Sequence, residues 1–285
     1  MSRRFNTSEF SLRLILGSRA LDHVYRRLDR LRSRLIVAFA SDDVLARFND
    51  VAYEGTSLYR PGTSRFREYL FPWEEAVISS HFPRPPGRVV VGGAGGGREA
   101  FGLAEMGFEV VAIEPASVLV DAMARRAQDV TGLTVYRGAY EDLPQVFAPE
   151  SSPESSRGAV DLQSLGTFDA AILGWGSFSY IRTEDHRART LEAFARVTNG
   201  PILVSFIEIR PDSRRHGKRR LAWLDEITRR AGRDPLDRFS IHMGYLHPVS
   251  KAEVEALSQR VGLAVLELEF QASETMAPYA VLAPA

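Results

Sequence analysis

Apolar positions recur at helical spacing over the first 80 or so residues of the chain. Most stand three or four positions apart in an arginine-rich background, namely Leu12, Leu14, Ile15, Leu21, Val24, Leu28, Leu31 and Leu35. This spacing places apolar side chains on one face of a helix. A turn pair, Pro61-Gly62, interrupts the pattern, and Pro72 stands where a new helix would begin. We therefore predict a helical N-terminal cap over residues 1–84.

From Arg88 onward, short apolar runs alternate with helical patterns. The predicted strands are 89–91, 108–113, 133–136, 168–173, 202–207, 264–270 and 279–282, and the predicted helices are 98–106, 117–130, 183–197 and about 250–260. Strands that alternate with helices in this way wind into a parallel sheet covered on both faces. The predicted fold class is therefore α/β, with a doubly wound, seven-stranded mixed sheet in residues 85–285.

Two stretches interrupt this alternation. Residues 148–161 are rich in proline, serine and acidic side chains, so we predict a mobile loop. Residues 210–240 form a basic insertion with an apolar face that includes Leu221, Trp223, Leu224 and Ile227. Such a basic amphipathic helix serves as a lid over an anionic acceptor, as a docking surface or as a weak nucleic-acid contact, or it is only a solvated face.

Composition narrows the function classes. The chain has 285 residues, and its formal net charge of zero argues against bulk capture of nucleic acid. It has no cysteine, which excludes disulfides and thiolate metal sites and favours a reducing compartment. No apolar run approaches the roughly 20 residues of a membrane span, and the sequence MSRRFNTSEF has no signal-peptide apolar region. We expect a soluble cytoplasmic protein, and the scattered histidines and acids predict no metal site.

A glycine cluster, Gly92-Gly93-Ala94-Gly95-Gly96-Gly97, joins the first predicted strand to the next helix. Backbone without side chains can approach a ligand closely, and the helix start presents free N–H groups. Glu114 lies 21 residues beyond Gly93, at the end of the second strand, where a carboxylate can accept both hydroxyls of a ribose. The two features predict a nucleotide site. The frame from Gly95 to Ala100 also fits the alanine-ended dinucleotide pattern, so NAD remains open.

Four segments, taken together, resemble the class I S-adenosylmethionine-dependent methyltransferases. They are residues 89–97, 111–116, 138–144 and 168–174, and the similarity extends over about residues 85–285. The resemblance implies a Rossmann-like fold, S-adenosylmethionine as cofactor, and methyl transfer to an oxygen or nitrogen of a small-molecule acceptor. The alternatives are an NAD(P)-dependent oxidoreductase and a nucleotide-binding protein without turnover.

The resemblance also implies a set of cofactor contacts. These are Gly93, Ala94, Gly95, Gly97, Glu114, Pro115, Tyr140, Glu141, Gly174 and Trp175. Two positions depart from the family pattern, because Val91 and Ala139 stand where acidic residues are common. Adenine recognition then falls to Glu141, Asp142 or backbone, with Tyr140 offering a ring face. Glu99 either reaches the cofactor's amino group or is an exposed first-turn residue.

On the acceptor side, the resemblance points to the loop after the fourth strand and to the region before the last helix. Trp175 and Phe178 offer aromatic faces to a sulfonium, or simply fill the core. The expected acceptor contacts are Tyr59, Arg60, Phe178 and Tyr245, and an anionic acceptor would suit the basic stretch. His242 or His247 is the expected general base, if one is used, since histidine titrates near neutral pH. The oligomeric state is left open.

Overall fold

The computed structural model describes residues 7–55, 69–147, 159–208, 222–270 and 277–285. Its centre is one sheet with the strand order β10-β11-β7-β6-β1-β2-β3-β4-β5. The strands are β1 (Arg88–Gly92), β2 (Glu109–Glu114), β3 (Leu133–Arg137), β4 (Gln145–Phe147), β5 (Ala159–Asp161), β6 (Ala170–Leu173), β7 (Ile202–Ser205), β10 (Leu263–Glu269) and β11 (Tyr279–Pro284). The doubly wound α/β sheet predicted from the sequence is confirmed.

Strand β1 lies at the point where the strand order reverses. It pairs in parallel with β2 on one side and with β6 on the other. The chain therefore winds outward in both directions from β1, through β2 and β3 and through β6 and β7. In sheets of this kind ligands bind at the carboxyl ends of the strands beside the reversal.

Two hydrophobic cores cover the two faces of the sheet. Val89 and Val91 of β1 belong to the core under helices α3 (Pro72–His81), α4 (Arg98–Glu105) and α5 (Ser117–Ala127). Val90 belongs to the opposite core, under α6 (Glu184–Val197) and α9 (Lys251–Arg260). Successive side chains of a strand point to opposite faces, so a run of three valines is buried on both sides.

Within the described parts of the chain, the sheet has nine strands rather than the predicted seven. The additional strands, β4 and β5, each have three residues and pair with each other in antiparallel fashion. A segment this short is below the length at which alternation can be recognised in a sequence. The predicted loop over 148–161 is therefore wrong at 159–161, which is β5, whereas 148–158 lies outside the described residues.

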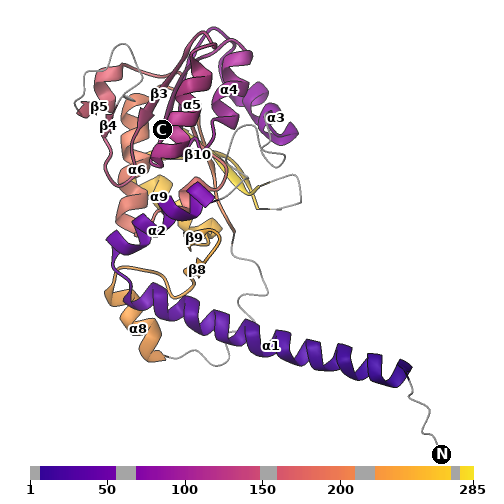
Figure 1. Ribbon diagram of the computed structural model, residues 1–285. Coiled ribbons are helices and arrows are strands. Elements are labelled where there is room, and N and C mark those ends of the chain that lie inside the picture. The colour runs from indigo at the N-terminus through magenta and orange to yellow at the C-terminus, as the bar shows by residue number, and fades with distance from the viewer. Residues whose placement is uncertain (1–6, 56–68, 148–158, 209–221, 271–276) are drawn as a thin grey trace, which may run out of the picture.

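The N-terminal helices pack against the basic insertion. Helix α1 (Thr7–Phe39) contacts α8 (Ala222–Arg230) and β8 (Arg238–Ser240), and α2 (Asp42–Gly55) contacts β9 (Gly244–Leu246), the partner of β8 in a small separate sheet. Figure 1 shows the N-terminal half of α1 projecting away from the rest of the molecule.

Side-chain and backbone bonds fasten this contact. Arg34 pairs with Asp225 of α8, the backbone N–H of Phe239 donates to Ser33 at 2.7 Å, and Arg233 donates to the Val37 carbonyl at 2.5 Å. The predicted apolar face of the insertion is only partly covered, because Leu224 is fully buried but Trp223 is 54% exposed. None of the helices that the structure describes is both long enough and apolar enough to cross a membrane.

Candidate functional site

A pocket opens at the carboxyl ends of four neighbouring strands. Gly93 and Gly95 follow β1, Glu114 ends β2, Gly138 follows β3, and Trp175 stands in the loop after β6. The remaining lining residues are Ala46, Asn49, Pro115, Leu119, Ala139, Tyr140, Glu141, Ser177, Tyr180, Ile181 and Arg182. The pocket thus occupies the position at which a sheet of this topology binds ligands.

The turn between β1 and α4 depends on glycine. Gly93, Gly95 and Gly97 have φ angles of +61°, +57° and +89°, in the left-handed region that other residues enter only with strain. A Cβ on Gly93 would lie 2.5 Å from the Cβ of Ser177. Gly96 is not among the residues with positive φ. Gly95 and Gly97 are also the two glycines of the alanine-ended dinucleotide frame, so their φ angles are compatible with both patterns.

Glu114 is buried at the end of β2, and backbone amides hold its carboxylate. One oxygen accepts from the N–H of Gly95 at 2.8 Å, and the other accepts from the N–H of Ala116 at 3.0 Å. Each oxygen of a carboxylate can accept more than one hydrogen bond. The carboxylate is fixed in orientation beside the glycine turn, and the residue lines the pocket.

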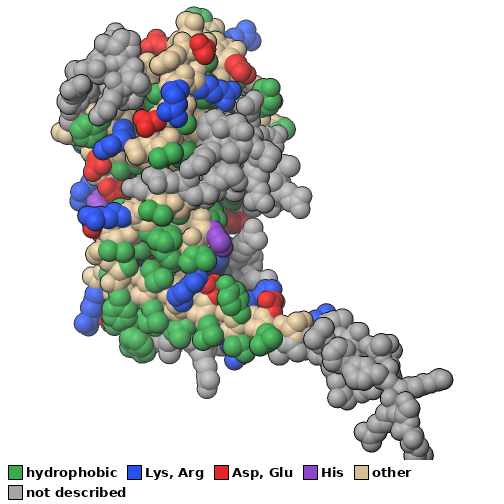
Figure 2. Space-filling view, viewed as in Figure 1, with side chains coloured by type: hydrophobic (Ala, Val, Ile, Leu, Met, Phe, Trp, Pro, Cys, Tyr) green, Lys and Arg blue, Asp and Glu red, His purple; other side chains and the backbone are tan. Residues whose placement is uncertain are grey.

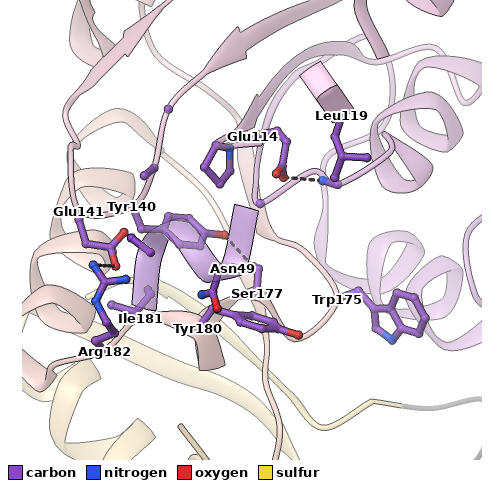
Figure 3. A pocket seen from close by; sticks show the side chains of 16 residues that line it. Asn49, Glu114, Leu119, Tyr140, Glu141, Trp175, Ser177, Tyr180, Ile181 and Arg182 are labelled. Carbon is purple, nitrogen blue, oxygen red and sulfur yellow. Dashed lines mark hydrogen bonds and ion pairs between the residues drawn. The ribbon is translucent and has the colours of Figure 1, made fainter. Parts of the chain in front are cut away.

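Tyr140 and Ser177 meet over the start of the glycine turn. Their hydroxyls lie 2.7 Å apart, and Figure 3 shows the tyrosine hydroxyl pointing toward the serine. A Cβ on Gly93 would also lie 2.8 Å from the Tyr140 hydroxyl. Burial raises the pKa of Tyr140 far above its usual value, so this phenol stays neutral. The pair forms a neutral, polar wall.

A second wall comes from segments distant in sequence. Asn49 of α2 accepts at its side-chain oxygen from the Tyr245 N–H, 3.1 Å away, and lines the pocket. Arg182 pairs with Glu141 at 3.1 Å, and its Nε lies 3.4 Å from Asp42. Figure 3 shows the Arg182 and Glu141 side chains meeting at one side of the pocket. The arginine charge is thus already compensated by carboxylates.

A buried ionic network lies behind the Trp175 loop. Arg98 donates two bonds to Glu74, at 2.5 and 2.7 Å, and one to Glu99 at 2.6 Å. Its guanidinium also lies 4.4 Å from the ring centre of Phe71. Glu99 is only 4% exposed, so the expectation of an exposed first-turn glutamate is wrong. Its carboxylate instead accepts from the Trp175 N–H, and sequence reasoning missed this network.

The structure brings most of the expected cofactor residues to the pocket. Those that line it are Gly93, Gly95, Glu114, Pro115, Tyr140, Glu141 and Trp175. Ala94, Gly97 and Gly174 belong to the adjoining turns but do not line the pocket. The expected site did not include Asn49, Leu119, Ser177, Tyr180 or Arg182. Asn49 comes from the distant helix α2, whereas Leu119 lies in the helix after β2 and Ser177 and Tyr180 lie in the segment after β6.

The two expected acceptor residues that the structure describes are buried in the core. Phe178 is 2% exposed and belongs to the core under α6 and α9, which is the core-filling alternative. Tyr245 is fully buried, and its hydroxyl lies 2.5 Å from an Asp237 carboxylate oxygen and 2.9 Å from the Arg182 carbonyl oxygen. Neither lines the pocket. Tyr59 and Arg60 lie outside the described residues.

Neither expected histidine reaches the pocket. His242 is exposed in the turn between β8 and β9. His247 is 2% exposed, with Nδ1 2.6 Å from Asp237 and Nε2 2.9 Å from Glu253. Burial acts to lower the pKa of His247, but the hydrogen bonds to the two carboxylates act to raise it, and the net direction is upward. Both ring nitrogens are hydrogen-bonded to carboxylates, so His247 has a structural role and is not placed to act as the general base.

Comparison with solved structures identifies the fold. The sequence matches no protein-family model and no curated protein. Among solved structures, a protein from Pyrococcus horikoshii OT3 is 13% identical with a TM-score of 0.51, and covers 82% of this chain and 98% of its own. The CcbJ methyltransferase from Streptomyces caelestis and a SAM-dependent methyltransferase from Methanosarcina mazei are each 14% identical, with TM-scores of 0.50. They cover 74% and 75% of this chain, and 88% and 95% of their own. The chain therefore has the Rossmann-like fold of the class I S-adenosylmethionine-dependent methyltransferases.

Proposed function

We propose that the chain is an S-adenosylmethionine-dependent methyltransferase that acts on an oxygen or nitrogen of a small-molecule acceptor. The observation that carries the proposal is the buried carboxylate of Glu114, fixed by the Gly95 and Ala116 amides beside a turn with three left-handed glycines. It stands in a pocket at the strand-order reversal. The fold of two neighbours that are named as methyltransferases supports it.

The pocket suits an adenosine. The Glu114 carboxylate lines the pocket and is an acceptor of the kind that binds ribose hydroxyls. Pro115, Leu119 and Ala139 supply an apolar lining suited to a purine. Gly93 and Gly95 let the backbone approach the ligand without Cβ atoms. When bound, the cofactor supplies an electrophilic methyl group on a sulfonium.

The acceptor is assigned to the wall formed by Asn49, Tyr180 and Arg182. Because Arg182 is already paired with Glu141 and Asp42, this wall does not present an uncompensated positive charge. Tyr140 and Ser177 remain neutral hydrogen-bonding partners. We infer that these residues orient the acceptor and exclude water, and that catalysis rests mainly on alignment of the acceptor with the methyl carbon.

Titration calorimetry with S-adenosylhomocysteine, S-adenosylmethionine and NAD tests the cofactor. We expect binding of the first two at one site per chain and none of NAD. Transfer of a labelled methyl group to a panel of small hydroxyl and amine acceptors then tests the reaction. Binding of NAD alone would favour an oxidoreductase, and tight S-adenosylmethionine binding without transfer to any acceptor would favour a non-catalytic nucleotide-binding protein.

A further inference from the structure

Helix α1 carries a regular heptad pattern. From Phe10 to Ala38, residues at alternating steps of four and three positions are apolar or small without exception. Steps of four and three average 3.5 residues, the repeat with which one helix packs along another in a coiled coil. A helix that only covers its own domain needs a broader apolar face with the 3.6-residue period. The pattern therefore specifies a partner helix.

Most of the described part of this seam is exposed to solvent. On α1, Leu21, Val24, Leu28, Leu31 and Leu35 are 37–72% exposed, as is the neighbouring Phe39, whereas the last position of the pattern, Ala38, is buried. The body of the protein packs on other sides of the helix, through residues such as Ser33 and Val37. The apolar seam thus has no partner among the described residues.

The seam continues onto helix α2. Val44 and Val51 are 55% and 63% exposed, and Figure 2 shows hydrophobic side chains gathered over α2 and the neighbouring half of α1 on one face. The eight side chains of this seam surface are 37–72% exposed, and an interface of standard size needs roughly 800 Å² of surface from each partner. Monomeric proteins rarely expose so large an apolar patch.

Charges on the seam surface favour a protein partner over a lipid bilayer. Helix α1 has seven arginines and three acidic residues, a net charge of +4. Three of these arginines are held in ion pairs, Arg26 with Asp22, Arg32 with Asp29 and Arg34 with Asp225. The first turn of α2 adds Asp42 and Asp43 directly beside Phe39 and Val44. Asp42 pairs with Arg182 and Arg233, and Asp43 pairs with Arg47, so these charges are compensated within the chain and do not serve as anchors for a charged bilayer.

A second copy of the chain has the features that the seam surface needs in a partner. It supplies a helix with the same heptad period, an apolar area of the same size, and a projecting α1 half that can lie along the body-bound half of its neighbour (Figure 1). We propose that the protein forms a homodimer through the seam surface of α1 and α2. This proposal is independent of the enzymatic one.

Analytical ultracentrifugation of the full chain tests the dimer. We expect a mass near twice 31.7 kDa at micromolar concentration. Leu28→Asp places a charge in the centre of the seam and should raise the dimer dissociation constant at least 100-fold. Leu266→Asp, at a side chain 53% exposed on β10, is the matched control and should leave the dimer intact. Far-UV circular dichroism checks that both variants keep their helices.

Cross-linking gives a second readout, because the chain has no native cysteine. Under mild oxidation, Leu28→Cys should give a disulfide-linked dimer and Leu266→Cys should not. A wild-type chain that stays at 31.7 kDa at every concentration would overturn the proposal. So would a dimer that Leu28→Asp leaves unchanged, or a monomer that instead floats with phosphatidylserine vesicles.

Discussion

The carboxylate of Glu99 accepts a hydrogen bond from the backbone N–H of Trp175, 3.1 Å away. This bond ties the first turn of α4 to the loop after β6, which carries the pocket residues Trp175 and Ser177. Glu99 is held in turn by Arg98, whose other bonds reach Glu74 of α3. The geometry of the Trp175 loop therefore depends on one buried ionic network that spans three segments.

Replacement of Arg98 should be strongly destabilising. Arg98→Met removes the cation but leaves Glu74 and Glu99 buried, and loss of one partner of a buried ion pair costs about 3–5 kcal/mol. Arg196→Met is the control, because Arg196 forms an exposed pair with Glu192 that is worth at most about 1 kcal/mol. Urea unfolding measures both. Equal losses in the two variants would contradict the role given to the network.

Gly93→Ala should lower both stability and cofactor affinity. Its φ of +61° strains any residue with a Cβ, and that Cβ would collide with Ser177 at 2.5 Å. Gly262→Ala separates the two effects, because Gly262 has φ +72° but no atom within 4 Å of the added carbon. We expect a loss of about 1–2 kcal/mol at Gly262, from backbone strain alone, and a larger loss at Gly93. Thermal unfolding and S-adenosylhomocysteine titration check this order.

Glu114→Gln should weaken S-adenosylhomocysteine binding by roughly 10- to 100-fold, because charge-assisted hydrogen bonds contribute about 1.5–3 kcal/mol. The amide keeps one acceptor oxygen, so part of the backbone anchoring survives. Glu109→Gln, at the exposed start of the same strand, is the control and should bind as the wild type does. Calorimetry measures both variants. Unchanged affinity in Glu114→Gln would contradict the assignment of the ribose to this carboxylate.

The sequence was informative where structure is determined locally. The apolar run at Val89–Val91, the glycine turn and the carboxylate at Glu114 lie within one strand-turn-helix-strand unit, so their pattern predicts their arrangement. The Arg98 network and the approach of Asn49 to the pocket depend on tertiary packing between segments distant in sequence. No local pattern encodes such contacts.

The histidine expectation failed for a related reason. The place of a residue after the fifth predicted strand does not determine whether its side chain faces the pocket or the core. His247 is turned into the core between Asp237 and Glu253. His242 lies at the tip of a hairpin on the N-terminal helices.

The His247 site predicts a particular dependence of stability on pH. The pKa of His247 is raised in the folded protein above 6.5, so its contribution to stability is complete below that pH and is lost as the pH rises through the folded value. The pKa of Glu253 is lowered: burial acts to raise it, but His247 and Arg187 outweigh burial. Its contribution is therefore lost as the pH falls. Stability should decline on both sides of a mildly acidic to neutral range.

Urea unfolding of the wild type and of His247→Gln from pH 6 to 9 isolates the contribution of His247 to the dependence of stability on pH. The wild type should lose stability as the pH rises, whereas the variant, which has no proton to release at this site, should be less stable at pH 6 and flatter above it. Asp237, Glu253, Arg187 and Tyr245 remain around the site in the variant. The exposed His242→Gln variant should follow the wild-type curve. If His247→Gln keeps the wild-type slope, the imidazole is not the group that releases the proton, and the raised pKa assigned to it is wrong.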